Sequence, residues 1–278
     1  MKNMSVLSRS VIHGLIILYI VFLLFPLLWV VASSLKPTQE IYSGAPTILP
    51  QQITFDHYSS VINGQQIFRS MWNSVIVGTI STILVVLLAV PSAYAMVRYK
   101  SIVNNAILGW ILVSQIFPVI LVMIPLYVML RYIGLTDSLT GLTLIYVVWS
   151  LPFVLWMMHG YVKSIPLELE EAAVIDGASR TQVIFNVLMP LLLPAIGASA
   201  LFAFISAWNE FFFALVLMKS PTLATLQVEL ARYTGMEGQA RTGPLAAASV
   251  IATIPSIVLF VFMRKWFTTG LVSGALKG

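Results

Sequence analysis

Residues 162–192 read VKSIPLELEEAAVIDGASRTQVIFNVLMPLL, and they carry four of the 10 acidic residues of the chain. The stretch is too charged to enter a lipid bilayer and too apolar for a plain linker. Pro166 suits the first turn of a helix, and the glutamates that follow it complement the positive end of the helix dipole. A short helix is therefore predicted over about 167–175.

The second half of this stretch predicts a sharp corner and another helix. Gly177 can adopt the left-handed conformation that ends many helices. Ser179 followed by Gln182 is a capping-box pattern, which opens a helix. Pro190 and Pro194 are expected to bound that second helix. The product is two short helices joined at a corner.

On both sides of 162–192 the chain is dominated by apolar runs. Of its 278 residues, 59% are hydrophobic and 9% are charged, whereas a soluble domain is roughly half apolar and a quarter charged. About 20 apolar residues in a helix cross the hydrocarbon core of a bilayer. We therefore expect an all-α integral membrane protein, with a single transmembrane domain over 1–278. Six spans are predicted, at about 11–33, 72–96, 106–130, 139–161, 193–218 and 246–267.

Lysine and arginine residues near the span ends set the expected orientation. With the N-terminus in the cytoplasm, nine of the 15 basic residues lie inside and six outside, and the larger number falls on the shorter segments, in line with the positive-inside rule. Both termini, the segment 162–192 and a C-terminal tail over 268–278 are then cytoplasmic. The longer outer segments are 34–71, with a short helix around 55–62, and 219–245.

Composition and motifs exclude several function classes. The chain has no cysteine and 3 separated histidines, so we expect no metal site and no bound cofactor. It has no G-x-x-x-x-G-K-[ST] phosphate loop and no nucleophile motif, so no catalytic residue is assigned and any ATP is hydrolysed by another polypeptide. The formal net charge of +5 is scattered, and Lys163 and Arg180 alone cannot form a nucleic-acid surface.

Two interpretations of the two-helix corner remain open on physical grounds. It could rest on the membrane surface as an amphipathic hairpin, although interfacial helices favour lysine and arginine over glutamate. Alternatively, it is a compact, rigid element that docks into a groove of a cytoplasmic partner.

The spacing of residues within this segment resembles a known motif. Glu171-Ala172-Ala173, three residues, Gly177, nine residues and then Val187-Leu188-Met189-Pro190 are similar to the EAA loop of the membrane subunits of bacterial ABC importers. The family pattern is EAA, three residues, G, nine residues and I-x-L-P. Val187 and Met189 replace the usual isoleucine and leucine and keep the apolar bulk. The stretches 176–179, 208–211 and 270–278 further resemble the MalG-like permeases of carbohydrate importers.

The resemblance implies a fold, a function and partners. The fold is that of a type I ABC importer permease with cytoplasmic EAA coupling helices, in the bacterial inner membrane. The chain is expected to form half of the translocation pathway for a sugar or oligosaccharide. A MalF-like permease would form the other half, two copies of an ABC ATPase would bind ATP and Mg²⁺, and an extracytoplasmic sugar-binding protein would deliver the substrate. The alternative is a secondary transporter or channel subunit driven by an ion gradient, but the inverted repeats and buried charges of such folds are missing here beyond Glu210.

The resemblance also implies two sites of contact with the ATPase. In the coupling loop, Glu171 would anchor a basic or hydrogen-bonding partner, and Gly177 would form the corner. The whole set of candidate coupling residues is Glu171, Ala172, Ala173, Asp176, Gly177 and Pro190. In the tail, Gly270, Gly274 and Lys277 would reach the same interface, unless the tail is simply solvated.

Two further candidate sites lie in the fifth span and in the outer segment. Trp208, Asn209 and Glu210 are candidates for the sugar path, because aromatic faces, amides and carboxylates suit ring hydroxyls and Glu210 is the one acidic residue well inside a span. The alternative is a hydrogen bond between helices that fixes packing, and three consecutive residues cannot all face one direction on a helix. By the resemblance, the outer segment contacts the binding protein, although its glycines could form only a compact turn. The candidates there are Tyr233, Gly235, Met236 and Gly238.

Overall fold

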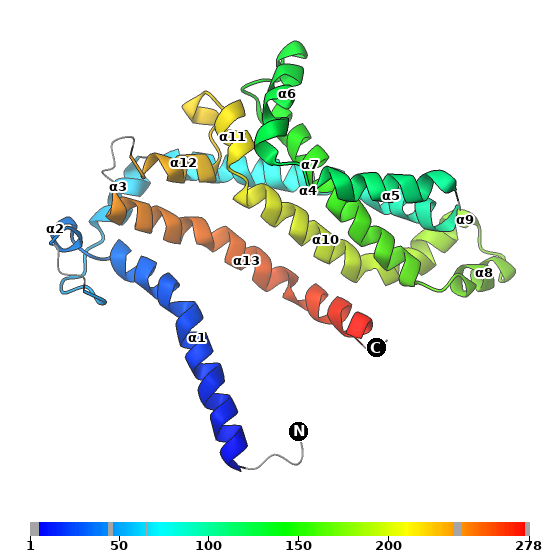
Figure 1. Ribbon diagram of the computed structural model, residues 1–278, viewed down its shortest axis with the longest axis horizontal. Helices are drawn as coiled ribbons and strands as arrows, with labels where there is room; N and C mark the ends of the chain where they lie inside the picture. Colours follow the sequence, from blue (N-terminus) through cyan, green and yellow to red (C-terminus); the bar gives the residue numbers. More distant parts are fainter. Residues whose placement is uncertain (1–5, 44–46, 65, 100, 236–240, 276–278) are drawn as a thin grey trace. The chain divides into compact units, whose positions relative to one another are not determined.

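The computed structural model describes residues 6–43, 47–64, 66–99, 101–235 and 241–275, and the regular elements within them are helices (Figure 1). Five helical stretches of the described chain are long and apolar enough to cross a membrane. They are α1 (Val6–Ser34), α4 (Gln66–Arg98), α7 (Leu139–Ser164), the run 180–209 and α13 (Thr242–Ala275). The all-helical membrane fold predicted from the sequence is thus confirmed, but the number of six long spans is not.

The predicted third span, 106–130, consists of two shorter helices, α5 (Ile102–Ser114) and α6 (Val119–Tyr132). Pro118 precedes α6 with a φ of −59° and a ψ of 130°, outside the helical region. Proline lacks an N–H group and disfavours the helical conformation of the residue before it, so the helix breaks here. Other prolines remain inside their helices, at Pro26, Pro91, Pro125, Pro152 and Pro255.

The helix observed in place of the predicted fifth span, 193–218, begins and ends at other residues. The helix that opens as α9 (Arg180–Gln182) continues through a π-helical turn (Val183–Leu188) into α10 (Met189–Asn209), and a separate helix, α11 (Phe212–Leu217), follows. The expectation that Pro190 and Pro194 bound the second short helix is therefore wrong. Pro190 lies in the first turn of α10, directly after the π-helical turn has changed the hydrogen-bonding pattern, so its missing N–H group does not end the helix.

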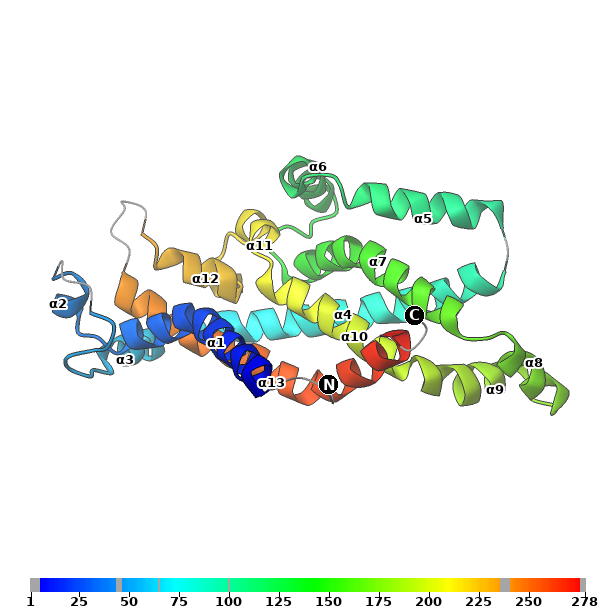
Figure 2. The ribbon, with the colours of Figure 1, turned by 60° about the horizontal axis from the view of Figure 1, so that its bottom comes forward.

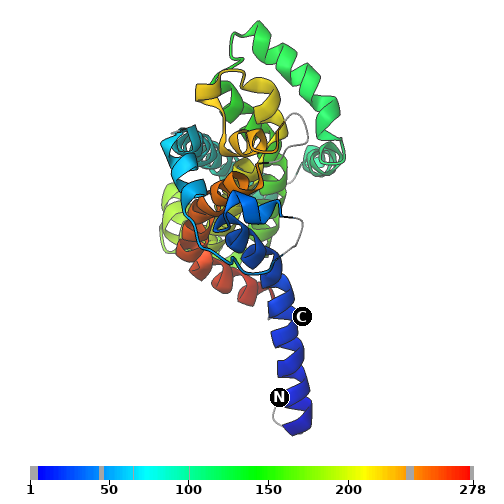
Figure 3. The same cartoon turned by 90° about the vertical axis from the view of Figure 1, so that its left-hand side faces the viewer.

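The chain divides into two compact units: residues 1–68 with 229–254, and residues 69–228 with 255–278. In the first unit, α1 runs away from α2 (Thr38–Ile41) and α3 (Asp56–Asn63) with its apolar side chains exposed, a surface suited to lipid (Figure 3). The short helix predicted around 55–62 is confirmed by α3. Within it, the buried His57 lies with Nε2 2.9 Å from the carbonyl oxygen of Lys36. Gly243 packs so closely on the His57 ring that a Cβ atom there would overlap it.

The second unit is built around α7, with α5 and α10 packed against it (Figure 2). A first core lies towards the C-terminal end of α7, where Val154, Met158 and Val162 pack against small residues such as Ala93 of α4 and Ala195 of α10. Small side chains let helices approach closely when lipid provides no hydrophobic driving force. A second core surrounds the N-terminal half of α7 and includes Tyr146, Phe213 and Leu217.

A carboxylate joins two loops of the second unit. Asp137, whose φ is 51°, accepts hydrogen bonds from the backbone N–H groups of Lys219 (2.9 Å) and Ser220 (3.0 Å) and from the Ser220 hydroxyl (2.5 Å). The hydroxyl of Ser220, followed by its backbone N–H group, lowers the pKa of Asp137 below its ordinary value. The loop before α7 is thereby fastened to the loop after α11.

Replacement of Asp137 by asparagine tests this fastening, because asparagine also tolerates the left-handed backbone. A lowered pKa in the folded state means that the carboxylate stabilises the fold above its unfolded pKa of about 4, and that this contribution is lost as the pH falls through the lower folded value. We expect Asp137→Asn to lower the thermal unfolding midpoint of the detergent-purified protein at pH 7. The difference from the wild type should shrink below about pH 4. The same change at the exposed Asp56 should have a smaller effect, and equal shifts for both variants would contradict the assignment.

Candidate functional site

The two-helix corner predicted from 162–192 is present. Helix α8 (Glu168–Ile175) leads to Gly177, whose φ is 87°, and the N–H group of Ala178 donates to the carbonyl oxygen of Ala173 at 3.0 Å. Ser179 then caps α9 with both halves of the capping box formed. Helix, glycine corner and capping box are all confirmed, so the corner is closed by its own backbone and side-chain hydrogen bonds.

The outer surface of this corner is unusually apolar for a charged segment. Ile175 is 85% exposed and Phe185 is 64% exposed. The candidate coupling residues Glu171, Ala172 and Asp176 are exposed beside them. Large apolar side chains exposed at a closed corner form a surface suited to contact with another molecule.

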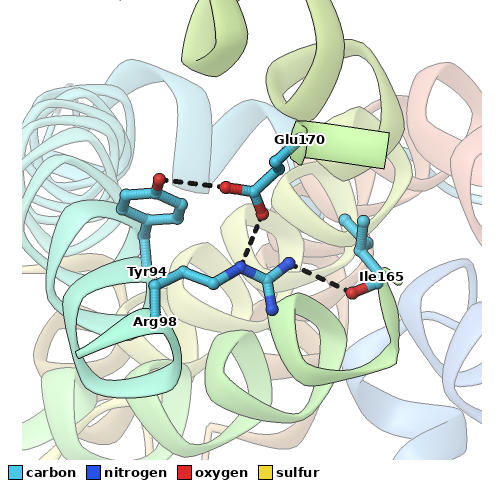
Figure 4. A network of polar contacts seen from close by, with 4 residues as sticks. All are labelled: Tyr94, Arg98, Ile165 and Glu170. Carbon is cyan, nitrogen blue, oxygen red and sulfur yellow. Dashed lines mark hydrogen bonds and ion pairs between the residues drawn. The ribbon is translucent and has the colours of Figure 1, made fainter. Parts of the chain in front are cut away.

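The inner surface of the corner is held by an ion pair (Figure 4). The carboxylate of Glu170, a residue that is only 7% exposed, accepts a hydrogen bond from Nε of Arg98 (2.5 Å) and another from the hydroxyl of Tyr94 (3.1 Å). Nη2 of Arg98 donates to the carbonyl oxygen of Ile165 at 3.0 Å. Breaking a buried pair of this kind by removing one partner costs about 3–5 kcal/mol.

Neither Arg98 nor Glu170 is singled out by the EAA pattern. A signal was nevertheless available in the sequence, because Glu170 and Glu171 are adjacent on one helix and cannot share a face. In the structure Glu170 points towards the rest of the protein, where Tyr94 and Arg98, four residues apart on α4, supply its partners. The other, Glu171, makes no side-chain hydrogen bond or ion pair with any residue that the structure describes.

The three candidate residues of the sugar path occupy different environments. Trp208 is 3% exposed and its ring stacks on Phe204, with 5.8 Å between the ring centroids. Glu210 accepts hydrogen bonds from the Tyr146 hydroxyl (2.9 Å) and from backbone N–H groups of α11, including that of Phe213 (2.8 Å). Asn209 presents its side chain at the surface. Glu210 thus caps α11, and Asn209 is the member of the set that is free to meet a ligand.

The candidate residues of the tail and the outer segment are described only in part. Helix α13 continues to Ala275, so Gly270 and Gly274 lie within a helix, where the sequence predicts a separate tail over 268–278. Each glycine costs about 1 kcal/mol in a helix, which does not stop a helix that is already propagating. Tyr233 and Gly235, whose φ is 72°, follow α12 (Leu226–Arg232). Lys277, Met236 and Gly238 lie outside the described residues.

Comparison with known proteins decides the family. Residues 85–272 match the model of the binding-protein-dependent transport system inner membrane component. The chain belongs to this family of ABC importer permeases. The match favours the permease over a transporter driven by an ion gradient, and it agrees with the resemblance carried by the EAA segment.

Relatives and solved structures cover this permease almost from end to end. It is 32% identical over 276 residues to the trehalose/maltose transport system permease protein MalG of Thermococcus litoralis, covering 99% of both chains. It is 34% identical to the trehalose transport system permease protein SugB of Mycobacterium tuberculosis, covering 92% of this chain and 93% of that one. A crystal structure of a bacterial ABC transporter that imports alginate aligns with a TM-score of 0.78 at 24% identity, over 95% of this chain and 99% of that chain. The permease therefore has the fold of an ABC importer membrane subunit.

Gly177 offers a test of the corner. An alanine there would have to keep a φ of 87°, although no atom lies within 4 Å of the added Cβ, so the cost is backbone strain of about 1–2 kcal/mol. We expect Gly177→Ala to accelerate amide hydrogen exchange over 168–182 by about 5- to 30-fold. Gly160→Ala is the matched control, because Gly160 is also open but lies inside α7 with an ordinary helical backbone. Unchanged exchange in Gly177→Ala would contradict the left-handed corner.

Proposed function

We propose that this permease forms half of the translocation pathway for a sugar or oligosaccharide that an extracytoplasmic sugar-binding protein delivers. The observation that carries the proposal is the match over 99% of both chains with a trehalose/maltose permease. An alginate ABC transporter in complex with a periplasmic protein that holds an alginate pentasaccharide has the same fold, with a TM-score of 0.66 at 19% identity. A second, MalF-like permease supplies the other half of the pathway.

The energy source in this proposal is a pair of ABC ATPase subunits, which hold ATP and Mg²⁺, and one of them receives the corner around Gly177. The exposed carboxylate of Glu171 meets a basic or hydrogen-bonding group there, and Ala172 and Ala173 allow close approach. The exposed Ile175 fits an apolar groove. Asp176 and Pro190 lie in the same capped segment, which transmits displacement better than a flexible loop.

The remaining candidate sites are part of the same proposal. The end of α13, with Gly270 and Gly274, and Lys277 beyond it contact the ATPase. The outer segment with Tyr233, Gly235, Met236 and Gly238 contacts the binding protein. Asn209 touches the sugar, while Trp208 and Glu210 hold the end of α10 in place. Both termini lie in the cytoplasm, and this chain itself binds no cofactor and performs no catalysis.

Transport by the reconstituted complex tests the proposal. The permease is assembled in proteoliposomes with a second, MalF-like permease, an ABC ATPase and a sugar-binding protein from the same organism, and trehalose, maltose and longer glucosides are offered as probes. We expect uptake that requires both ATP and the binding protein. Uptake under an ion gradient without ATP, or ATP-driven uptake of amino acids but no sugar, would overturn it.

Charge reversal at Glu171 tests the docking role of the corner. Because its carboxylate is exposed, Glu171→Lys should leave insertion and assembly intact but reduce uptake per ATP hydrolysed at least tenfold, by placing a cation against the basic partner. Glu168→Lys makes the same change one helical turn before Glu171, farther from the corner at Gly177, and should have a smaller effect. Normal sugar-stimulated hydrolysis and uptake in Glu171→Lys would remove the docking assignment.

A further inference from the structure

One guanidinium group holds together the ends of three helices. Arg98 is the last residue of α4, its Nε lies 2.5 Å from Oε1 of Glu170 in α8, and its Nη2 lies 3.0 Å from the carbonyl oxygen of Ile165, which ends α7. We call Tyr94, Arg98, Glu170 and the Ile165 carbonyl the Arg98 clasp (Figure 4). We propose that Arg98 and Glu170 are positioning residues that make the coupling corner and α4 move as one body.

The chemistry of the clasp favours a stiff link. The last carbonyl groups of a helix have no partner within the helix, and the Ile165 carbonyl finds one in Arg98. The guanidinium is planar and presents its N–H donors in a fixed fork, so satisfying both acceptors fixes α8 relative to the end of α7. The Tyr94 hydroxyl, one turn earlier on α4, holds the second oxygen of Glu170 at 3.1 Å.

Burial makes the clasp costly to open. The side chains of Arg98 and Glu170 are 12% and 9% exposed. Two exposed charges that separate lose little, whereas a buried charge that loses its partner keeps its desolvation cost. A force on the outer surface of α8 will therefore carry α4 along before it breaks the pair. The neighbouring contact between Arg180 and the Tyr99 hydroxyl is 3.4 Å long and exposed, so it cannot serve the same purpose.

The far end of α4 is also fastened, to the segment that follows α11. Nδ2 of Asn73 donates to the carbonyl oxygens of Thr222 and Ala224, both at 3.0 Å, and Oγ of Ser74 accepts from the N–H group of Leu226 at 2.9 Å. From Asn73 to Arg98 the helix is roughly 37 Å long at 1.5 Å per residue. Helix α4 thus connects the coupling corner with residues 222–226 at the other end of this unit. Displacement at the clasp is thus passed along α4 to that segment.

The inference rests on the proposed coupling function, so its test combines a functional measurement with a structural one. The functional measurement is sugar imported per ATP hydrolysed in proteoliposomes, together with the amount of assembled complex. We expect Arg98→Gln and Glu170→Gln each to lower this ratio at least fivefold, and the double variant to be no worse than either single one, because the residues act as a pair. Arg98→Glu combined with Glu170→Arg should recover part of the ratio. Arg180→Gln is the matched control and should stay within twofold of the wild type.

The structural measurement uses the absence of cysteine in the chain. Spin labels at Glu168→Cys and at the exposed Leu87→Cys report the distance between α8 and α4. In the wild type this distance should be the same without nucleotide and with ATP bound, whereas in Arg98→Gln it should change between the two states. If Arg98→Gln does not assemble, Arg98→Lys, which retains the charge but not the fork, replaces it in both measurements.

The possible results separate the clasp from the proposed function. Absence of ATP-dependent uptake in the wild type would count against the proposed function. Wild-type uptake with an unchanged ratio and a constant label distance in the clasp variants would overturn the clasp. Reduced assembly with an unchanged ratio would also overturn it, because a merely structural role predicts that result.

Discussion

The hydrocarbon of a bilayer offers no water to the backbone, so every peptide group within it must find a partner in the protein. Helices meet this constraint along their length but not at their ends. In this permease, polar side chains are placed where helices end. Glu210 accepts hydrogen bonds from free N–H groups of α11, Arg98 donates to the carbonyl of Ile165 directly after α7, and Asn73 donates to two carbonyls after α11. These hydrogen bonds allow the helices to be interrupted, and they hold the chain in place at each interruption.

The corner around Gly177 combines a rigid backbone with the exposed surface on which we propose that the ATPase docks. Two neighbouring glutamates lie in different environments, because side chains one position apart on a helix point in different directions. Glu170 is buried against Arg98 and holds the corner to the membrane helices, while Glu171 remains exposed. Gly177 and the capping box then fix the shape of the corner independently of either charge. The residue that we propose to dock the ATPase and the residue that fastens the corner are therefore consecutive, which suits the proposed transmission of force.

Several features of the fold follow from local sequence alone. The apolar runs predict helices that cross a membrane, and Pro166, Gly177 and Ser179 predict the corner, because length, proline, glycine and capping chemistry act over a few residues. Nothing in the sequence distinguishes Pro118, where the helix is interrupted, from the prolines through which helices continue. Seven prolines lie in predicted spans, and whether a helix continues through one depends on neighbouring groups that satisfy the freed carbonyls.

The sequence by itself determined the class of this protein, most of its helices and the capped corner around Gly177, since these depend on hydropathy, spacing and capping residues. Tertiary structure alone decided which polar groups meet. Arg98 and Glu170 are 72 residues apart, and Tyr146 and Glu210 are 64 apart. No local pattern encodes such pairs, because they form only when packing of α7 against its neighbours brings helix ends together. Packing also decided that Glu210 caps a helix. From its residue type alone, Glu210 was equally suited to bind a ligand.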